Sequence, residues 1–231
     1  QGSIERPGDV DFFQVNLTAG NHYKFQVAQS NYQLALMEIE EEEDEDEDYF
    51  FKDAVLTMTL YDSNGTELFF SDYPLVFFEH PYALTKYHYS PTDGVYYWKV
   101  AAQEGKKKSY RLKVELLIDD HGNTRESATS MVEGETVTGK INYPRDEDFF
   151  SIDLKAGSYT FIPRITEHLN AGIYVSVFDS DGDQLDWGWD EQYYFNDHHE
   201  PVHVVTDADG LFYAKMTGDV VPYSLEVAAS P

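Results

Sequence analysis

The sequence predicts an all-β protein built from two tandem antiparallel β-sandwich domains of a jelly-roll-like kind. The first observation behind this is a repeat: "GSIERPGDVDFFQVNLTAG" at residues 2–20 returns as "GKINYPRDEDFFSIDLKAG" at residues 139–157, with ten identities in 19 ungapped positions. The second is alternation, because apolar and polar residues take turns in "DFFQVNL" and "DFFSIDL", the period of a half-buried strand. A repeat of this length indicates two copies of one folded unit.

Further segments recur in the same order along the chain and set the domain boundaries. The matched pairs are "LYDSNGTEL" with "VFDSDGDQL", "TDGVYYWKV" with "ADGLFYAKM", and "YRLKV" with "YSLEV". We therefore expect one domain at residues 1–118, with an acidic insertion at 38–48, and a second at residues 119–231, opened by an acidic linker at 119–124.

Tight turns are predicted between the strands of each copy. Asn64-Gly65 and Asp181-Gly182 are dipeptides that favour positive φ, as hairpin turns require. The segment "DSDGDQLD" at 179–186 superficially resembles an EF-hand loop, but its glycine comes too early and its twelfth position is not glutamate. We expect a hairpin turn there and not a dedicated calcium loop.

Composition limits the partners of the chain. Its net charge is −27, so phosphate would be repelled, and we expect no nucleic-acid partner. No stretch of 18 to 20 apolar residues is present, so no membrane insertion is expected. The chain lacks cysteine, which excludes disulfides and thiolate metal sites. Acidic residues are spread through the turns of the second half, a distribution that favours local cation sites.

The combined order of these segments resembles a known family. G-x-I-x-x-P-x-D-x-D-F-F, then L-x-A-G, D-S-N/D-G, D-G-x-Y/F-Y and Y-x-L-x-V resemble the bacterial pre-peptidase C-terminal domain, which is related to the collagen-binding domain of clostridial collagenases. The resemblance implies a non-catalytic β-sandwich attached to a secreted or cell-surface bacterial protein, with extracellular protein or polysaccharide as partner. The first copy departs from the pattern, because it lacks the lead-in segment that precedes the second.

Paired acids at the start of each repeated strand are candidate metal ligands. Two carboxylates two positions apart on a strand point the same way and offer oxygen ligands suited to Ca²⁺, although they could instead cap the entry to the strand. The resemblance implies that acids of the linker join them in holding the cofactor Ca²⁺. The candidates are Asp119, Asp120, Asn123, Asp146 and Asp148 in the second copy, and Asp9 and Asp11 in the first.

A zinc-protease signature, H-E-x-x-H, occurs at residues 199–203. That chemistry needs a helix, so that His199 and His203 face one metal while Glu200 activates water. Pro201 interrupts the segment, and the residues after it continue as a strand pattern. A zinc metalloenzyme is therefore kept as an alternative and is not the expectation.

Two further segments could contact partners. "DWGWDEQYYF" offers Trp187, Trp189, Tyr193 and Tyr194 between acids, where exposed rings would stack on sugars or grip peptide side chains. The alternative is a sandwich strand that buries these rings. The acidic run at 38–48 is expected to be a solvated loop; loose cation condensation or a basic partner is the alternative.

Together these observations predict a non-catalytic accessory module, attached to a peptidase or another hydrolase, stabilised by calcium and binding a protein or polysaccharide. A structural repeat of an adhesin or surface protein, with no ligand pocket, is the alternative. The two share a fold, and function depends on sites more than on fold.

Overall fold

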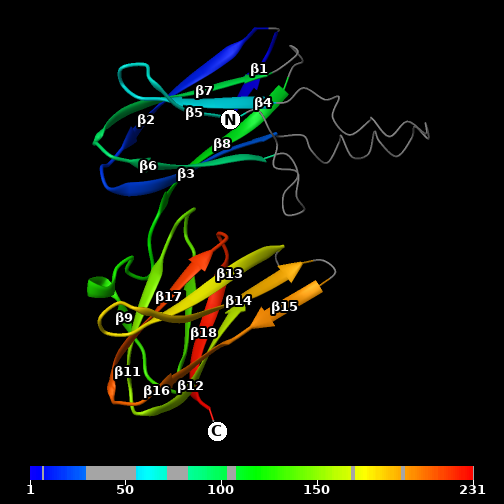
Figure 1. The fold of residues 1–231 in the computed structure, drawn as a ribbon. Coiled ribbons are helices and arrows are strands. Elements are labelled where there is room, and N and C mark those ends of the chain that lie inside the picture. Colours follow the sequence, from blue (N-terminus) through cyan, green and yellow to red (C-terminus); the bar gives the residue numbers. More distant parts are fainter. Residues whose placement is uncertain are drawn as a thin grey trace, which may run out of the picture. The chain divides into compact units, whose positions relative to one another are not determined.

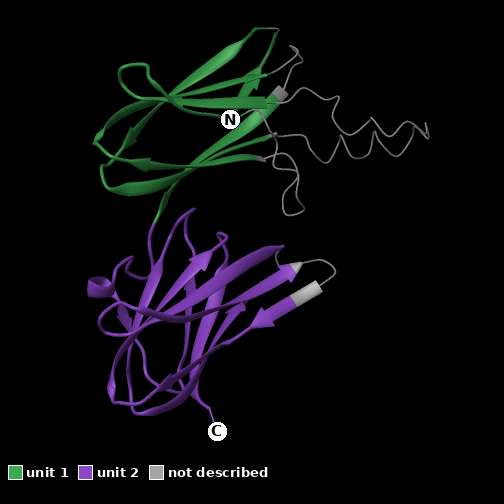
Figure 2. Cartoon of the chain, viewed as in Figure 1, with its two compact units in different colours: residues 1–117 green, residues 118–231 purple. Residues whose placement is uncertain are grey.

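The computed structural model describes residues 1–6, 8–29, 56–71, 83–102, 108–167, 170–193 and 196–230. In these residues the secondary structure consists of β-strands and one 3-10 turn, η3, at Arg125–Ser127, so the all-β prediction is confirmed. The chain divides into two compact units, Gln1–Leu117 and Ile118–Pro231 (Figure 2). The acidic insertion predicted at 38–48 lies outside the described residues.

The first unit contains two four-stranded antiparallel sheets (Figure 1). In the first sheet the order is β1 (Gly2–Ile4), β8 (Lys108–Leu117), β3 (Asn21–Gln29) and β6 (Ala83–Ser90). In the second it is β2 (Val10–Leu17), β7 (Gly94–Ala102), β4 (Leu56–Tyr61) and β5 (Glu67–Ser71).

The second unit has the same strand orders with two strands added. One sheet runs β10 (Thr136–Lys140), β18 (Pro222–Ala229), β12 (Gly157–Ile165) and β16 (Val202–Thr206). The other runs β15 (Asn196–Glu200), β14 (Gln184–Tyr193), β13 (Ala171–Phe178), β17 (Gly210–Gly218), β11 (Asp148–Leu154) and β9 (Thr129–Ser130). β15 and β9 extend this sheet at its two edges, and β9 pairs with β11 in parallel, unlike the antiparallel pairs elsewhere in the described strands.

Each unit has its own apolar core between its two sheets, made by the alternate residues that the period-2 pattern singles out. In the second unit β11 contributes Phe150, Ile152 and Leu154, all buried. In the first, Phe25 of β3 meets Trp98 of β7 edge to face, with ring centroids 5.1 Å apart. Burial of these side chains is the main favourable term in folding each unit.

The predicted hairpins are present as β4–β5 and β13–β14. Their loops are longer than a two-residue turn, and in each dipeptide only the glycine takes a positive φ, 82° at Gly65 and 93° at Gly182. The preceding aspartate closes the loop instead: Asp179 Oδ1 accepts backbone N–H groups at 2.9 to 3.0 Å, and Asp62 Oδ1 does the same at 2.8 Å. "DSDGDQLD" is therefore a hairpin loop, as predicted.

Candidate metal centre

The segment that leads into the second unit runs along the free edge of β11. The backbone N–H of Phe149 donates to the carbonyl of Gly122 at 3.0 Å, and the N–H of Met131 donates to the carbonyl of Ser151 at 2.9 Å. Met131 is buried in the core of the unit. These contacts fix the path of residues 119–131, which we call the lead-in segment, and bring its acidic start to the beginning of β11.

Three of the predicted ligands meet there. Asp119, Asp146 and Asp148 place carboxylate oxygens within 4.8 Å of one another. Asp146 is 1% exposed and Asp148 is 0% exposed. On each of these two, Oδ2 accepts a short hydrogen bond, from the backbone N–H of Asn142 and from the hydroxyl of Tyr223 respectively, both at 2.6 Å. Oδ1 of each is buried with no hydrogen-bond partner among the described residues.

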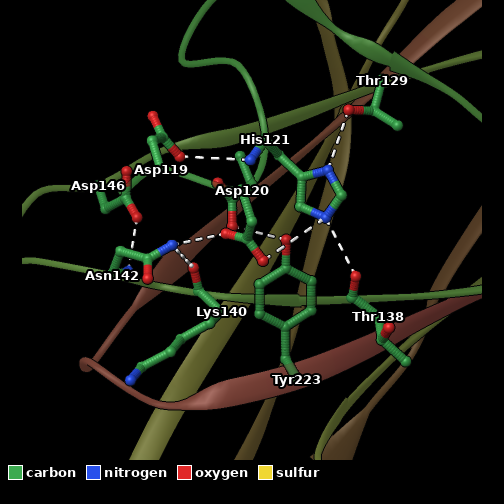
Figure 3. Close-up of polar contacts among 10 residues, drawn as sticks. Asp119, Asp120, His121, Thr129, Thr138, Lys140, Asn142, Asp146 and Tyr223 are labelled. Carbon is green, nitrogen blue, oxygen red and sulfur yellow. Dashed lines mark hydrogen bonds and ion pairs between the residues drawn. The ribbon is translucent and has the colours of Figure 1, made fainter. Parts of the chain in front are cut away.

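Two of the predicted ligands have other roles in the same place. Asp120 Oδ1 accepts from the side-chain amide of Asn142 at 2.6 Å, and its carboxylate stays partly exposed (Figure 3). Asn123 uses its carbonyl to accept the backbone N–H of Glu147 at 2.9 Å, and its amide donates to Asp119. Asn123 therefore positions Asp119 and the start of β11, and its own oxygen already accepts one hydrogen bond.

The electrostatics of the site disfavour three bare carboxylates. Burial raises the pKa of Asp148 to about 7, and the negative charges of Asp146, Asp120 and Asp119 add to the effect. Burial likewise raises the pKa of Asp146 to about 6. Without a cation, the buried pair holds protons to near neutral pH, because burial and like charges both penalise the ionised form.

Several residues that complete this site were not singled out by the sequence. His121 holds the lead-in segment in place: its Nδ1 lies 2.9 Å from Thr129 Oγ1, and its Nε2 lies 3.1 Å from the carbonyl of Thr138 (Figure 3). Its ring centroid lies 4.7 Å from that of Phe150. Tyr223 comes from the last strand. Its recurrence as Tyr110 in the first copy was visible in the sequence, but its contact with Asp148 was not.

The first unit repeats part of this arrangement. Asp9 Oδ2 accepts the backbone N–H of Glu5 at 2.9 Å, and the hydroxyl of Tyr110 donates to Asp11. Both aspartates are only half-buried. Within the described residues, no third metal-ligating side chain joins them in a group like that of the second unit.

The H-E-x-x-H segment does not form a shared site in the described residues. His199 lies on β15, with its Nδ1 3.7 Å from Asp190, whereas His203 lies on β16, with its Nδ1 3.0 Å from Thr160 Oγ1. β15 and β16 belong to different sheets, since the chain changes sheet at Pro201. The helical geometry that zinc proteases need is absent from this segment.

The aromatic candidates lie on β14. Trp187 is 53% exposed, and neither it nor Trp189 belongs to the buried core. The indole N–H of Trp189 donates to Glu200 at 3.1 Å. The segment is a strand, as the alternative interpretation held, but neither of its two tryptophan rings is buried. The side chain of Tyr193 and all of Tyr194 lie outside the described residues.

The comparisons with known proteins give matches among solved structures alone. No known family model matches the chain, and no curated protein does. Among solved structures, the pre-peptidase C-terminal domain of a collagenase from Bacillus anthracis aligns with 46% of this chain and 99% of its own, at 14% identity and a TM-score of 0.34. A structure of infectious bursal disease virus covers 98% of this chain and 72% of its own, at 9% identity and a TM-score of 0.23. No helix among the described residues is long and apolar enough to cross a membrane.

Proposed function

We propose that this chain is a calcium-stabilised, non-catalytic binding module of a secreted bacterial protein, of the pre-peptidase C-terminal kind and attached to a peptidase or another hydrolase. The observation that carries the proposal is the pair of buried, unpartnered oxygens on Asp146 and Asp148, directed to the same place as Asp119. A buried anion without a partner is costly, and a bound cation removes that cost.

The donor set favours calcium over other metals. Its ligands are carboxylate oxygens, and no histidine or cysteine belongs to the group. Oxygen-only sites suit hard cations, and Ca²⁺ accepts six to eight oxygens with irregular geometry. Asp119, Asp146 and Asp148 each offer one carboxylate oxygen to the group, Asp120 lies beside them, and water can supply the remaining ligands. Mg²⁺ demands a near-octahedral set, which a group closed by two buried carboxylates fits less well.

Calcium at this position would link the lead-in segment to the start of β11. Asp119 belongs to that segment, whereas Asp146 and Asp148 belong to the start of β11, so a shared ion joins the two. Its role would be structural, because ligand binding to the native state alone stabilises that state.

Calorimetric titration of the chelated protein tests this proposal. We expect one calcium ion per chain, and we expect the Asp148→Asn variant to bind none. The matched control is Asp11→Asn, which changes the equivalent aspartate of the first unit and should leave the ion bound to the second. A wild-type chain that takes up no calcium at millimolar concentration contradicts the proposal.

A second site is proposed for the ligand of the module. Trp187 is exposed on β14, and Tyr174 of the neighbouring strand β13, also exposed, pairs with Trp189. An aromatic surface flanked by carboxylates suits an extracellular protein or a polysaccharide. The adhesin-repeat alternative needs no such surface. Pull-down against collagen, chitin, cellulose and peptidoglycan, with wild type and Trp187→Ala, separates the two: binding lost in the variant supports the module, and no binding to any polymer favours the repeat.

A further inference from the structure

In the second unit the lead-in segment covers one edge of β11, and among the described residues of the first unit no segment covers the corresponding edge of β2. At the constant offset of the repeat, Phe12 corresponds to Phe149, and Gln14 corresponds to Ser151. β11 pairs with β17 on one side and with β9 on the other, whereas β2 ends its sheet, and no described strand pairs with its outer side. By this correspondence the N–H of Phe12 and the carbonyl of Gln14 point outward from β2.

The side chains along this edge are more exposed in the first unit. Phe12 is 59% exposed, while Phe149 is half-buried. Phe13 is half-buried, while its counterpart Phe150 is 0% exposed, with His121 of the lead-in segment against its ring. The first unit therefore has an apolar strip at the position where the second unit has a strand seated.

The outer face of the sheet beside this edge is also more exposed in the first unit than in the second. In the second unit, the guanidinium of Arg125 lies 5.8 Å from the ring of Tyr213, and it occupies the space next to Gly182. The corresponding Tyr97 of the first unit is exposed, and the ring of Phe12 lies 6.5 Å from that of Tyr61. Cation–π contact with such rings is favourable for arginine.

β2 has few of the features that keep exposed edges from pairing. Natural edge strands are protected by charged side chains, above all lysine, by proline, by a bulge or by a short length. The charged residue of β2 is Asp11, whose carboxylate accepts a hydrogen bond from Tyr110. β2 runs for eight residues as VDFFQVNL, with neither lysine nor proline, and its register with β7 is regular. An edge of this kind can pair with a further strand.

We infer that this surface, formed by Phe12, Gln14 and Tyr97 and bordered on its core side by Phe13, binds an extended peptide segment of a partner protein. The segment adds as a strand parallel to β2 and has the chemistry of residues 122–131: an arginine that covers the Tyr97 ring and, six residues later, an unbranched apolar side chain such as methionine that enters the core. Main-chain hydrogen bonds would supply affinity and the two side chains specificity, as in other cases of strand addition.

The test uses the whole chain and a synthetic peptide with the sequence of residues 122–132, GNTRESATSMV. This peptide omits Asp119 and Asp120, so the result does not depend on calcium. Amide hydrogen exchange followed by NMR should slow by about tenfold or more at Phe12 and Gln14 when the peptide is saturating. A peptide carrying Met131→Asp should bind about tenfold more weakly, because a charge cannot enter the core.

A matched pair of protein variants locates the site. Phe12→Ala should abolish peptide binding, while Phe70→Ala, which removes a similarly exposed ring (47%) at the opposite edge of the same sheet, should retain it. The inference is overturned if exchange at Phe12 and Gln14 is unchanged by millimolar peptide, or if only β11 responds. It is also overturned if sedimentation shows that the chain self-associates and protects the same amides without peptide, because the occupant is then a second copy.

Discussion

The two units contain the same acid pair in the same contacts, yet among the described residues only the second unit builds a candidate metal centre. In both, a tyrosine of the last strand donates to the second aspartate, and a backbone N–H four residues earlier donates to the first. The difference is the lead-in segment, which supplies Asp119 and covers the edge of β11. The comparison teaches that two strand carboxylates are not enough: the third ligand and the burial both come from a neighbouring segment.

Calcium should affect the second unit most strongly. At a concentration one hundredfold above its dissociation constant, calcium should raise the melting temperature of that unit by roughly 10–20 °C. Differential scanning calorimetry with chelator and with calcium measures the shift. Asp148→Asn should remove it and Asp11→Asn should not. Equal shifts in the transitions of both units would show that the lead-in segment is not what distinguishes them.

The pH dependence of the calcium-free protein sharpens the same comparison. Asp146 and Asp148 have pKa values raised in the folded state to about 6 and about 7, above the unfolded value near 4. Between these values the folded state binds more protons than the unfolded state, so stability is greatest below about pH 4 and is lost as the pH rises through 7. The contribution of these two groups should therefore lower the melting temperature of the second unit as the pH rises from about 4 to about 7.

Calcium and substitution should both reverse that trend. Because the ion binds the ionised carboxylates, its affinity should increase up to about pH 7, with protons released on binding. Asp148→Asn should raise the melting temperature of the chelated protein at pH 8, since it removes a buried charge. Melting curves at pH 5 and pH 8, with and without chelator, measure both effects. A chelated wild type that is more stable at pH 8 through this transition would contradict the assignment.

The glycines that open the two repeats offer a smaller contrast. A methyl group at Gly139 would lie 2.5 Å from the hydroxyl of Tyr223 and 2.7 Å from the ring of His121, whereas a methyl group at Gly2 would collide with the side chain of Tyr110. Gly139→Ala should cost about 1–3 kcal/mol and also weaken calcium binding, because it displaces both contacts of the site. Gly2→Ala should cost a similar amount without affecting calcium. Chemical denaturation and calcium titration of both variants measure this.

The smallest effect on stability is expected at the exposed aromatic surface. Trp187→Ala should change the free energy of unfolding by about 0.5 kcal/mol or less, because its ring is outside the core. Loss of polymer binding with an unchanged fold would identify the ring as a contact residue. Unfolding of the second unit in this variant would instead indicate a packing role.

Much of the fold was predictable because its determinants are local. Alternation in "DFFSIDL" specifies β11, and Asp179 with Gly182 closes the loop that follows β13. The acid pair was predictable for the same reason, since residues two apart on a strand share a face. No local sequence pattern indicated that His121 would pack on Phe150, or that the side-chain carbonyl of Asn123 would accept a hydrogen bond from a backbone N–H.

The H-E-x-x-H motif shows that a correct residue spacing does not by itself predict a site. Its spacing is correct for zinc, but spacing brings side chains together only when the backbone has the matching period. Here Pro201 lies between two strands of different sheets, and His199 and His203 have separate partners. Pro201 and the strand pattern after it already argued against a shared zinc site, and the sheet pairing adds that the two histidines lie in different sheets.

The tyrosine that holds each strand aspartate has a consequence for the order in which the molecule matures. Residues 139, 148 and 223 come from the beginning and the end of the second unit, and residues 2, 11 and 110 do the same in the first. During synthesis from the N-terminus, the carboxylates emerge long before the hydroxyl that orients them. The tyrosine–aspartate contact of each unit can form only when the final strand of that unit has been translated. In an unfinished chain the aspartate carboxylates therefore remain solvated.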